Sequence, residues 1–425
     1  MNGFNYQRFF ADDLAQLRQE GRYRVFADLE REMQSGIRAY DHRAGRRITI
    51  WCSNDYLSMG VHPDVIGAAR DALEQYGAGA GGTRNISGTS HEHVLLEREL
   101  ADLHGKESAL LFTSGYVAND AALSSLGRLL PGCVIFSDEL NHASMIEGIR
   151  RSGAEKRIFA HNDWRDLESQ IASVCKYRPK LICFESCYSM DGDFAPMEAI
   201  CDIAAKHNAF TYVDEVHAVG LYGARGAGVA ERDGLLDRIN MFQGTLSKGF
   251  GAIGGYIAGA RDAVDFVRSH AAGFIFSTAL PPSVVAGIRA ALHHLKADGS
   301  ARLTLAKRAA SLKAKMLAND IPVLPSPSHI LPVMIGDAAL AKAITDRLMT
   351  EDGIYIQPIN YPTVPRGTER LRVTPTPLHT DEDEDALIEA LVAARRAFPR
   401  WRELAENILS TEHGGADAVL WENAE

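Results

Sequence analysis

Residues 210–217 read Phe-Thr-Tyr-Val-Asp-Glu-Val-His, a short apolar run that ends in an acid, Asp214. Apolar runs of this length without alternation are typical of a strand covered on both faces, as in a parallel sheet. In α/β folds, ligands bind at the edge of the sheet where such strands end. The stretch therefore predicts an α/β domain with Asp214 and His217 at a ligand-binding edge.

A second segment, residues 244–251, reads Gly-Thr-Leu-Ser-Lys-Gly-Phe-Gly and contains Lys248. A lysine amine forms a Schiff base with the aldehyde of pyridoxal phosphate, and a carboxylate keeps the pyridine nitrogen protonated so that the ring accepts electrons. Asp214 alone is equally explained as the cap of a turn. A buried carboxylate without a cationic partner is costly, however, and a protonated pyridine is a suitable partner. Together, Lys248 and Asp214 predict pyridoxal phosphate as cofactor.

Two other strand ends carry residues that suit this cofactor. Gly115 and Tyr116 begin a predicted helix directly after an apolar run, and the free N–H groups of a helix start bind phosphate. Thr245, three residues before the lysine, adds a hydroxyl for the same phosphate. His142 stands between another run and another helix, where its flat ring suits stacking on a flat cofactor. Alone, each has a structural explanation, a turn or a cap. Their shared sheet edge favours the cofactor.

Strands and helices alternate along the middle of the chain. This pattern predicts a large, mainly parallel α/β domain over residues 50–290. A capping-box signature at residues 89–92 precedes a periodic run at 94–103. The expected strands cover residues 109–112, 133–136, 157–160, 181–184, 210–213, 241–243 and 255–258.

Smaller parts flank this domain. Residues 1–49 form an N-terminal segment, in which 4–35 predict an amphipathic helix and its continuation, 41–47 a loop and 48–52 the start of a strand. Residues 291–410 predict a smaller α+β domain. A helix over 286–318 leads into it, and its strands cover 330–335, 355–357 and 370–373. Residues 411–425 lack a periodic stripe and predict a mobile tail.

Composition limits the kinds of partner. The formal charge of −10 argues against general binding to nucleic acid. No apolar run is long enough to cross a bilayer, and no signal peptide is apparent, so we expect no membrane association. The six cysteines include no CxxC pair, which favours reduced thiols in a cytoplasmic protein and no metal site.

With these residues identified, the chain resembles the 5-aminolevulinate synthases, which belong to the α-oxoamine synthases among the fold-type I pyridoxal-phosphate enzymes. The resemblance runs from Gly21 to about Leu378 and implies an aspartate aminotransferase-like large domain. The strings that carry it are residues 53–57 (Ser-Asn-Asp-Tyr-Leu), 79–88 (Gly-Ala-Gly-Gly-Thr-Arg-Asn-Ile-Ser-Gly), 140–148 (Leu-Asn-His-Ala-Ser-Met-Ile-Glu-Gly), 188–193 (Tyr-Ser-Met-Asp-Gly-Asp), 214–220 (Asp-Glu-Val-His-Ala-Val-Gly), 274–282 (Phe-Ile-Phe-Ser-Thr-Ala-Leu-Pro-Pro) and 357–367 (Gln-Pro-Ile-Asn-Tyr-Pro-Thr-Val-Pro-Arg-Gly).

The resemblance implies roles for the matching residues. Lys248 would hold the cofactor and remove a proton from the substrate, Asp214 would pair with the ring nitrogen, and His142 would stack on the ring and polarise the thioester. His217 and Ser189 would lie near the cofactor edge, Thr245 at its phosphate, and Ser277 and Thr278 at the phosphate of a partner subunit. The implied assembly is therefore a homodimer with shared active sites.

The implied reaction condenses glycine with succinyl-CoA to give 5-aminolevulinate, CoA and CO2, which points to tetrapyrrole synthesis or a specialised pathway. Arg372 and Asn54 would bind the glycine carboxylate, because a planar guanidinium suits a carboxylate. The residues implied for succinyl-CoA are Arg24, Thr83 and Asn85 at its distal carboxylate, and Ser137, Lys156 and Thr363 elsewhere on the acyl-CoA.

Three alternatives inside the family share the lysine chemistry: 8-amino-7-oxononanoate synthase, serine palmitoyltransferase and 2-amino-3-ketobutyrate CoA ligase. Arg24 and the run Thr83-Arg84-Asn85 favour a short acyl group that ends in a carboxylate. A fourth alternative is a non-catalytic pyridoxal-phosphate protein, such as the effector module of a transcription regulator. No basic helix-turn-helix segment precedes the α/β domain, which disfavours it.

The chain departs from the family pattern at Ser58, Ser247 and Cys187. Relatives commonly have glycine where Ser58 stands. If that backbone requires a positive φ, serine adds strain of about 1 kcal/mol.

Overall fold

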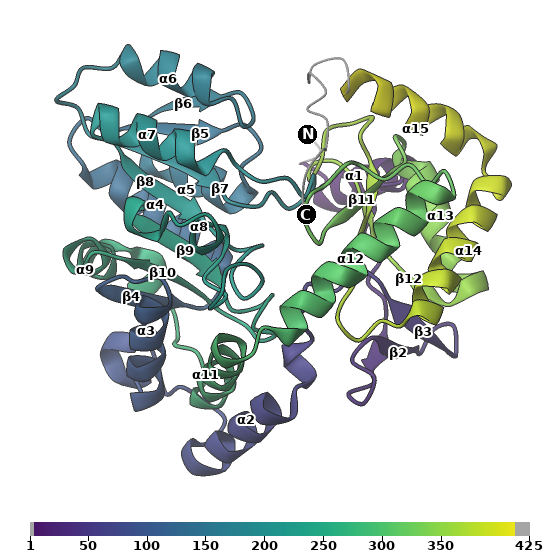
Figure 1. Cartoon of the computed structure of the whole chain (residues 1–425), viewed down its shortest axis with the longest axis horizontal. Helices are drawn as coiled ribbons and strands as arrows, with labels where there is room; N and C mark the ends of the chain where they lie inside the picture. The colour runs from purple at the N-terminus through teal and green to yellow at the C-terminus, as the bar shows by residue number, and fades with distance from the viewer. Residues whose placement is uncertain (1–3, 413–425) are drawn as a thin grey trace. The chain divides into compact units, whose positions relative to one another are not determined.

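A computed structural model describes residues 4–412 of the chain. It divides into two compact units, one formed by residues 54–306 and the other by the residues before and after them (Figure 1). The predicted domain boundaries at 50 and 290 therefore differ from those of the units. Within the described residues, no helix has the length and apolar character that a membrane span requires.

The larger unit is built on a seven-stranded sheet with the order β4-β10-β9-β8-β7-β5-β6. The sequence prediction of seven strands is confirmed, because each apolar run forms one strand and most are completely buried. The strands are β4 Ser108–Phe112, β5 Val134–Asp138, β6 Glu155–Phe159, β7 Lys180–Glu185, β8 Phe210–Asp214, β9 Met241–Thr245 and β10 Gly255–Gly259.

The sheet is mainly parallel, as predicted, with β10 antiparallel to both of its neighbours. The exception follows from chain length. Only nine residues, 246–254, separate β9 from β10, and a parallel crossover needs a dozen or more. The chain therefore turns back on itself, and Lys248 lies in the connection.

Helices cover both faces of this sheet (Figure 1). One core packs sheet residues such as Leu110, Ile135 and Tyr212 against α4 Gly115–Leu129, α5 Ala143–Ser152, α9 Arg261–His270 and α10 Ala272–Ile275. The remaining helices of the unit are α2 Pro63–Tyr76, α3 His91–Leu103, α6 Trp164–Ala172, α7 Met197–His207, the short α8 Val229–Arg232 and α11 Pro282–Ala297.

The smaller unit contains two sheets and its own core. One sheet has four strands in the order β1 Leu29–Arg31, β2 Arg38–Asp41, β3 Arg46–Ile50 and β12 Ile354–Tyr355. The other has three strands in the order β11 Leu331–Met334, β14 Arg370–Val373 and β13 Pro358–Ile359. Its core gathers Trp51, Leu331, Leu371 and Trp401. The helices are α1 Tyr6–Gln19, α12 Ser300–Ala318, which begins in the larger unit, α13 Ala338–Arg347, α14 Asp381–Ala397 and α15 Pro399–Glu412.

Several predictions for the chain ends were wrong in extent. The helix expected over 4–35 ends at Gln19, because Gly21 adopts a positive φ of 68° and the chain then becomes extended and forms β1 and β2. The helix expected over 286–318 is two helices, α11 and α12, separated at residues 298–299. The predicted tail begins inside α15, and residues 413–425 lie outside the described residues.

The predicted strand at 48–52 exists as β3, but it pairs within the smaller unit instead of beginning the larger one. The capping box predicted at Thr89 and Glu92 is formed one residue later. His93 Nδ1 lies 2.8 Å from Ser90 Oγ and 3.2 Å from Ser90 N. All six cysteines are free thiols, and four of them are buried.

Candidate active site

Asp214 ends β8, where its side chain is buried among polar groups that fix its orientation. Asn119 Nδ2 donates to Asp214 Oδ2 at 2.8 Å, and the Val216 backbone N–H donates to Oδ1 at 2.8 Å. Burial raises the pKa of Asp214 to about 6, opposed by these two donors and by the charge of Lys248. This carboxylate is held rigidly, and its ionised form is stabilised by a nearby positive charge.

Lys248 is partly exposed and lies within electrostatic range of three groups at the strand ends. Its charge favours the ionised forms of Asp214 and Glu185. Burial lowers the pKa of His142 to about 4, and the charge of Lys248 lowers it in the same direction. The structure therefore brings together the lysine, the acid and the imidazole that were predicted separately from the sequence. A neutral His142 follows at pH 7.

His142 is the N-cap of α5, and its hydrogen bonds define its tautomer. The Ser144 backbone N–H donates to His142 Nδ1 at 3.2 Å, so Nδ1 acts as an acceptor and the proton resides on Nε2. The backbone N–H of His142 donates to Glu185 Oε1 at 2.6 Å. The imidazole thus has one N–H donor, at Nε2.

The start of α4 is packed tightly against the neighbouring strands. A Cβ added to Gly115 would lie 3.2–3.3 Å from atoms of Gln243 and Thr245, so only glycine fits there without adjustment. Among the described residues, the backbone N–H groups of Gly115 and Tyr116 have no acceptor. Such unsatisfied donors at a helix start bind anions. Thr245 lies beside them, and its hydroxyl bonds to the Gly254 carbonyl at 3.0 Å and to Ser247 Oγ at 2.8 Å.

These features fit pyridoxal phosphate. The half-buried Lys248 amine suits its aldehyde, the buried acid Asp214 suits a protonated ring nitrogen, and the N–H groups of Gly115 and Tyr116 suit its phosphate. His217 lies near the same strand end, where its Nδ1 is 2.8 Å from the Tyr56 hydroxyl. Ser189 lies in the loop after β7.

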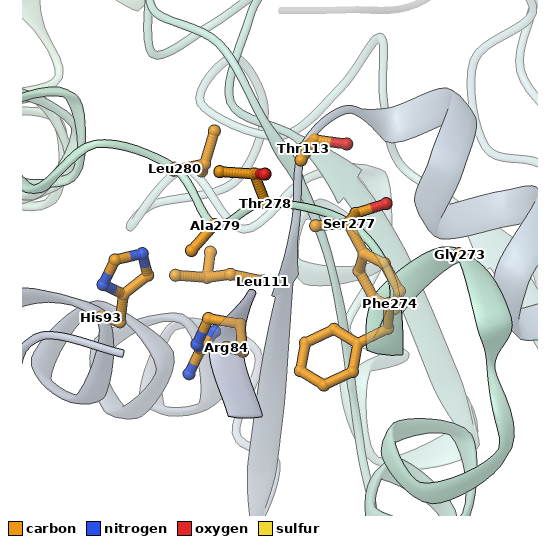
Figure 2. A pocket seen from close by; sticks show the side chains of 11 residues that line it. Arg84, His93, Leu111, Thr113, Gly273, Phe274, Ser277, Thr278, Ala279 and Leu280 are labelled. Atoms are coloured by element: carbon orange, nitrogen blue, oxygen red, sulfur yellow. The ribbon is translucent and has the colours of Figure 1, made fainter. Parts of the chain in front are cut away.

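The residues predicted to reach a partner subunit form part of a small recess in the larger unit. Figure 2 shows Ser277 and Thr278 beside Thr113, with Arg84 and His93 at the other side. Thr83 pairs with Thr278 through an isolated bridge, so the segment of Thr83 and Asn85 runs beside that of Ser277 and Thr278. Arg84 is committed elsewhere, since it makes a bidentate ion pair with Glu97 at 2.7 and 3.0 Å. It is a structural residue.

The other predicted acyl-CoA residues of the larger unit have different surroundings. Ser137 is buried in β5, where its hydroxyl donates to the Asp138 carbonyl and accepts from Asn141 Nδ2. Lys156 is exposed on β6, the edge strand of the sheet. Asn54 Oδ1 lies 3.3 Å from the Tyr56 hydroxyl.

The smaller unit contains the remaining predicted substrate residues. Arg24 and Thr363 line the same cavity of about 970 Å³, together with the cations Arg22, Arg43 and Lys342. Arg372 is buried in β14, and its charge lies near His329 and Cys52. The fold thus joins Arg24 to Thr363 across more than 300 residues of sequence.

Three residues at the site escaped the sequence reasoning. Asn119 orients Asp214, Tyr56 contacts His217, and Glu185 accepts from His142 while lying opposite Asp214 in the sheet. The signal for Asn119 was a polar residue inside an apolar helix, and for Glu185 an acid at the end of an apolar strand. Tyr56 carried no signal of its own.

Comparison with known proteins places this fold and site in a class. A model of the aminotransferase class I and II family matches residues 46–391. The chain is 56% identical to the 5-aminolevulinate synthase of Rhizobium meliloti over 389 residues, and 55% identical to that of Rhodobacter capsulatus over 394 residues. Each alignment covers 91% of this chain and 96% of the relative. The chain belongs to the aminotransferase class I and II family and, within it, to the 5-aminolevulinate synthases.

A solved structure extends the comparison. Serine palmitoyltransferase from S. paucimobilis, with PLP and myriocin bound, matches with a TM-score of 0.86 and 30% identity, covering 93% of this chain and 99% of that one. Pyridoxal phosphate, the cofactor predicted from the sequence, is confirmed by these relationships.

Proposed function

We propose that this protein condenses glycine with succinyl-CoA to give 5-aminolevulinate, CoA and CO2, with pyridoxal phosphate bound at Lys248. One observation carries the proposal. The charge of Lys248 acts on Asp214, Glu185 and His142 at adjoining strand ends, in a chain that is 56% identical to a 5-aminolevulinate synthase. When bound, the cofactor supplies an aldehyde for the glycine amine and a ring that accepts electrons from the α-carbon.

The chain's own residues then have distinct tasks. Lys248 Nζ removes a proton from the glycine α-carbon, and Asp214 holds a proton at the ring nitrogen. His142, neutral and with its proton on Nε2, donates a hydrogen bond to the thioester carbonyl as negative charge develops there. The cofactor is positioned by five further residues: His217, Ser189, Thr245, Gly115 and Tyr116.

We assign substrate recognition to the residues that the resemblance implies. Arg372 and Asn54 bind the glycine carboxylate, and Arg24, Thr83 and Asn85 bind the distal carboxylate of the succinyl group. Ser137, Lys156 and Thr363 contact the rest of the acyl-CoA. Arg24 and three further cations line the cavity of the smaller unit against two acids, Asp41 and Asp346. This excess of positive charge supports the assignment of Arg24, because the substrate is anionic.

The assembly we propose is a homodimer in which Ser277 and Thr278 reach the partner's phosphate. Two large apolar side chains flank them on the surface of the larger unit: Ile86 is 81% exposed and Phe276 is 79% exposed. Exposed apolar side chains on neighbouring segments favour burial against another chain. Thr83 is bridged to Thr278, so the proposed shared face includes the segment of Thr83 and Asn85. The free thiols support a cytoplasmic location.

An assay of the purified protein with glycine and succinyl-CoA tests the reaction. Alanine, serine and a panel of acyl-CoAs test the alternatives within the family, including palmitoyl-CoA for the serine palmitoyltransferase activity named for the solved neighbour. We expect glycine with succinyl-CoA to give the highest kcat/KM. Faster turnover with a long fatty acyl-CoA would overturn the assigned substrate.

Mixing two impaired variants tests the shared site. Lys248→Ala lacks the amine, and Thr278→Val lacks the hydroxyl that is proposed to serve the partner. Co-expressed, the two variants form mixed dimers in which one site keeps both groups, so activity returns. Recovery close to zero, with a dimer confirmed by sedimentation, would contradict sharing of the site.

A further inference from the structure

We infer that His161 is a positioning residue: it joins the end of β5 to the loop over residues 186–194, and thereby holds the segments that carry His142 and Ser189. The inference rests on the proposed function, because those two residues are assigned to the cofactor there. His161 itself lies after β6 and before α6, outside the residues that the reaction uses.

Both ring nitrogens of His161 face carboxylate oxygens. Nδ1 is 2.9 Å from Asp138 Oδ1, and Nε2 is 2.8 Å from Asp193 Oδ2. Ionised carboxylates only accept hydrogen bonds, so both nitrogens donate and the ring is an imidazolium. Burial lowers the pKa of His161, but Asp138 and Asp193 outweigh it and raise the pKa to about 10. The ring therefore keeps its charge at neutral pH.

Asp138 transmits this contact to the segment of His142. Its carboxylate is buried and also accepts from the backbone N–H of Leu140 at 2.8 Å and of Asn162 at 2.9 Å. Leu140 lies two residues before His142, whose own N–H is held by Glu185. The chain between β5 and α5 is thus fixed at both of its ends.

Asp193 transmits the contact to the loop of Ser189. Its backbone carbonyl accepts from Tyr188 N at 3.1 Å, and its Oδ2 also accepts from Asn162 Nδ2 at 2.7 Å. Within the loop, Gly192 N donates to the Tyr188 carbonyl, and Gly192 has a positive φ of 72°. Ser189 lies inside this closed turn, between Tyr188, which bonds to Asp193, and Asp193, which bonds to His161.

The charge arrangement favours a geometric role over general stabilisation. Two carboxylates share one imidazolium, with Glu139 accepting from the His161 backbone N–H and the Tyr188 ring 4.4 Å away, edge to face. Asp138 is buried and Asp193 is partly exposed, and ion pairs that bury a carboxylate often contribute little net stability because its desolvation is costly. They do fix orientation, since each hydrogen bond requires a defined distance and angle.

Hydrogen exchange of the cofactor-free protein tests the inference, with His161→Gln and the milder Asp193→Asn as variants. We expect the Tyr188 and Gly192 amides to lose about tenfold or more of their protection, while amides of β7 and β8 keep theirs. The dissociation constant of pyridoxal phosphate, measured by reconstitution, should rise about tenfold in each variant, which corresponds to one charge-assisted hydrogen bond. The double variant should have a loss of protection and a dissociation constant close to those of the single variants, because both changes remove the contact between His161 and Asp193.

Arg157→Gln is the matched control. Arg157 lies on β6, four residues before His161, and pairs with Glu155 and Ser173 without touching the 186–194 loop. It should leave loop protection and cofactor affinity unchanged. Wild-type protection and affinity in both His161 and Asp193 variants would overturn the inference, and so would a loss of protection spread evenly over the sheet. If the wild-type protein itself fails to bind pyridoxal phosphate, the proposed function fails, whereas the exchange pattern still decides the role of His161.

Discussion

At the end of β5, the carboxylates of Asp138 and Asp193 enclose the imidazolium of His161, whereas two strands away Asp214 is buried with neutral donors from Asn119 and Val216. The first group contains its own counter-charge. The second has a raised pKa, which shows that its ionised form is not fully stabilised by the protein.

The difference teaches where a ligand is expected in this sheet. A buried charged group whose counter-charge comes from the protein holds segments together. A buried charged group without a full counter-charge is stabilised further when a ligand of opposite charge binds. The charge of Lys248 acts on Asp214, and Glu185 lies opposite it in the sheet with a pKa that burial and Asp214 raise. Both kinds of site occur within one sheet edge and have different consequences when altered.

The largest effect is expected at Lys248. Lys248→Ala removes both the covalent attachment and the base, so turnover should fall by more than about a thousandfold, since proton transfer alone contributes about 10²–10⁴-fold. The variant should also leave no yellow adduct that borohydride reduces. Measured rates and absorbance spectra check both, and a reducible adduct at another lysine would contradict the assignment.

Asp214→Asn tests the buried carboxylate whose hydrogen-bond donors are neutral. Activity should fall by about 10²-fold or more, because a neutral partner no longer holds a proton at the ring nitrogen. In the cofactor-free protein, stability should change in the opposite direction. The folded pKa of Asp214 is about 6 and the ordinary value is 3.8, so ionisation destabilises the wild-type fold as pH rises from about 4 to 6.

Asp214→Asn removes the ionising group, so the variant does not lose stability as the pH rises. Its free energy of unfolding at pH 7 should therefore exceed that of the wild type by about 1–3 kcal/mol. Urea titrations at pH 4 and pH 7 measure the difference. Near-normal turnover, or a wild-type pH dependence of unfolding in the variant, would refute the role given to this acid.

Arg24→Ala extends the comparison to an exposed cation that lines the cavity of the smaller unit. The KM for succinyl-CoA should rise about tenfold or more, the equivalent of one charge-assisted hydrogen bond, with the KM for glycine unchanged. Arg43→Ala, in the same cavity, is the control. Equal effects of the two changes would indicate general attraction of an anion instead of a specific contact.

The smallest effect is expected from relief of backbone strain. Ser58 adopts a φ of 56° and is buried, so the condition under which serine was expected to add strain is met. Ser58→Gly should increase the free energy of unfolding by about 0.5–1 kcal/mol. Asn208→Gly, at φ 47° after α7, should gain less, because asparagine tolerates this conformation. Thermal melts of both variants compare them, and a destabilised Ser58→Gly protein would show that the serine hydroxyl matters more than strain.

Sequence reasoning succeeded for the strands of the larger unit, because buried parallel strands are continuous apolar runs whose ends are visible in the sequence. It therefore also predicted that Asp214, Lys248 and His142 lie at or shortly after strand ends. In the structure Asp214 ends β8, Lys248 lies three residues after β9, and His142 lies four residues after β5. It failed for residues 29–41, where β1 pairs with β2 and β2 pairs with β3. Local periodicity contains no record of the partners of such short strands, so a helix and its continuation were expected up to residue 35.

The same limit explains the missed residues of the site. Asn119 bonds to Asp214 across 95 positions, Tyr56 to His217 across 161, and Glu185 to His142 across 43. Each is an ordinary polar residue until the fold supplies its partner. The capping box was misplaced for a different reason: histidine at position 93 competes with glutamate at 92, and the backbone geometry decides between them.

The hairpin between β9 and β10 sets a limit on engineering this enzyme. Thr245 is paired with Gly255, and both strands continue in fixed register into the middle of the sheet. An inserted or deleted residue in this connection would shift one strand by a position and turn its side chains to the opposite face. Libraries that vary loop length to alter substrate range should therefore spare residues 246–254 and place their insertions elsewhere.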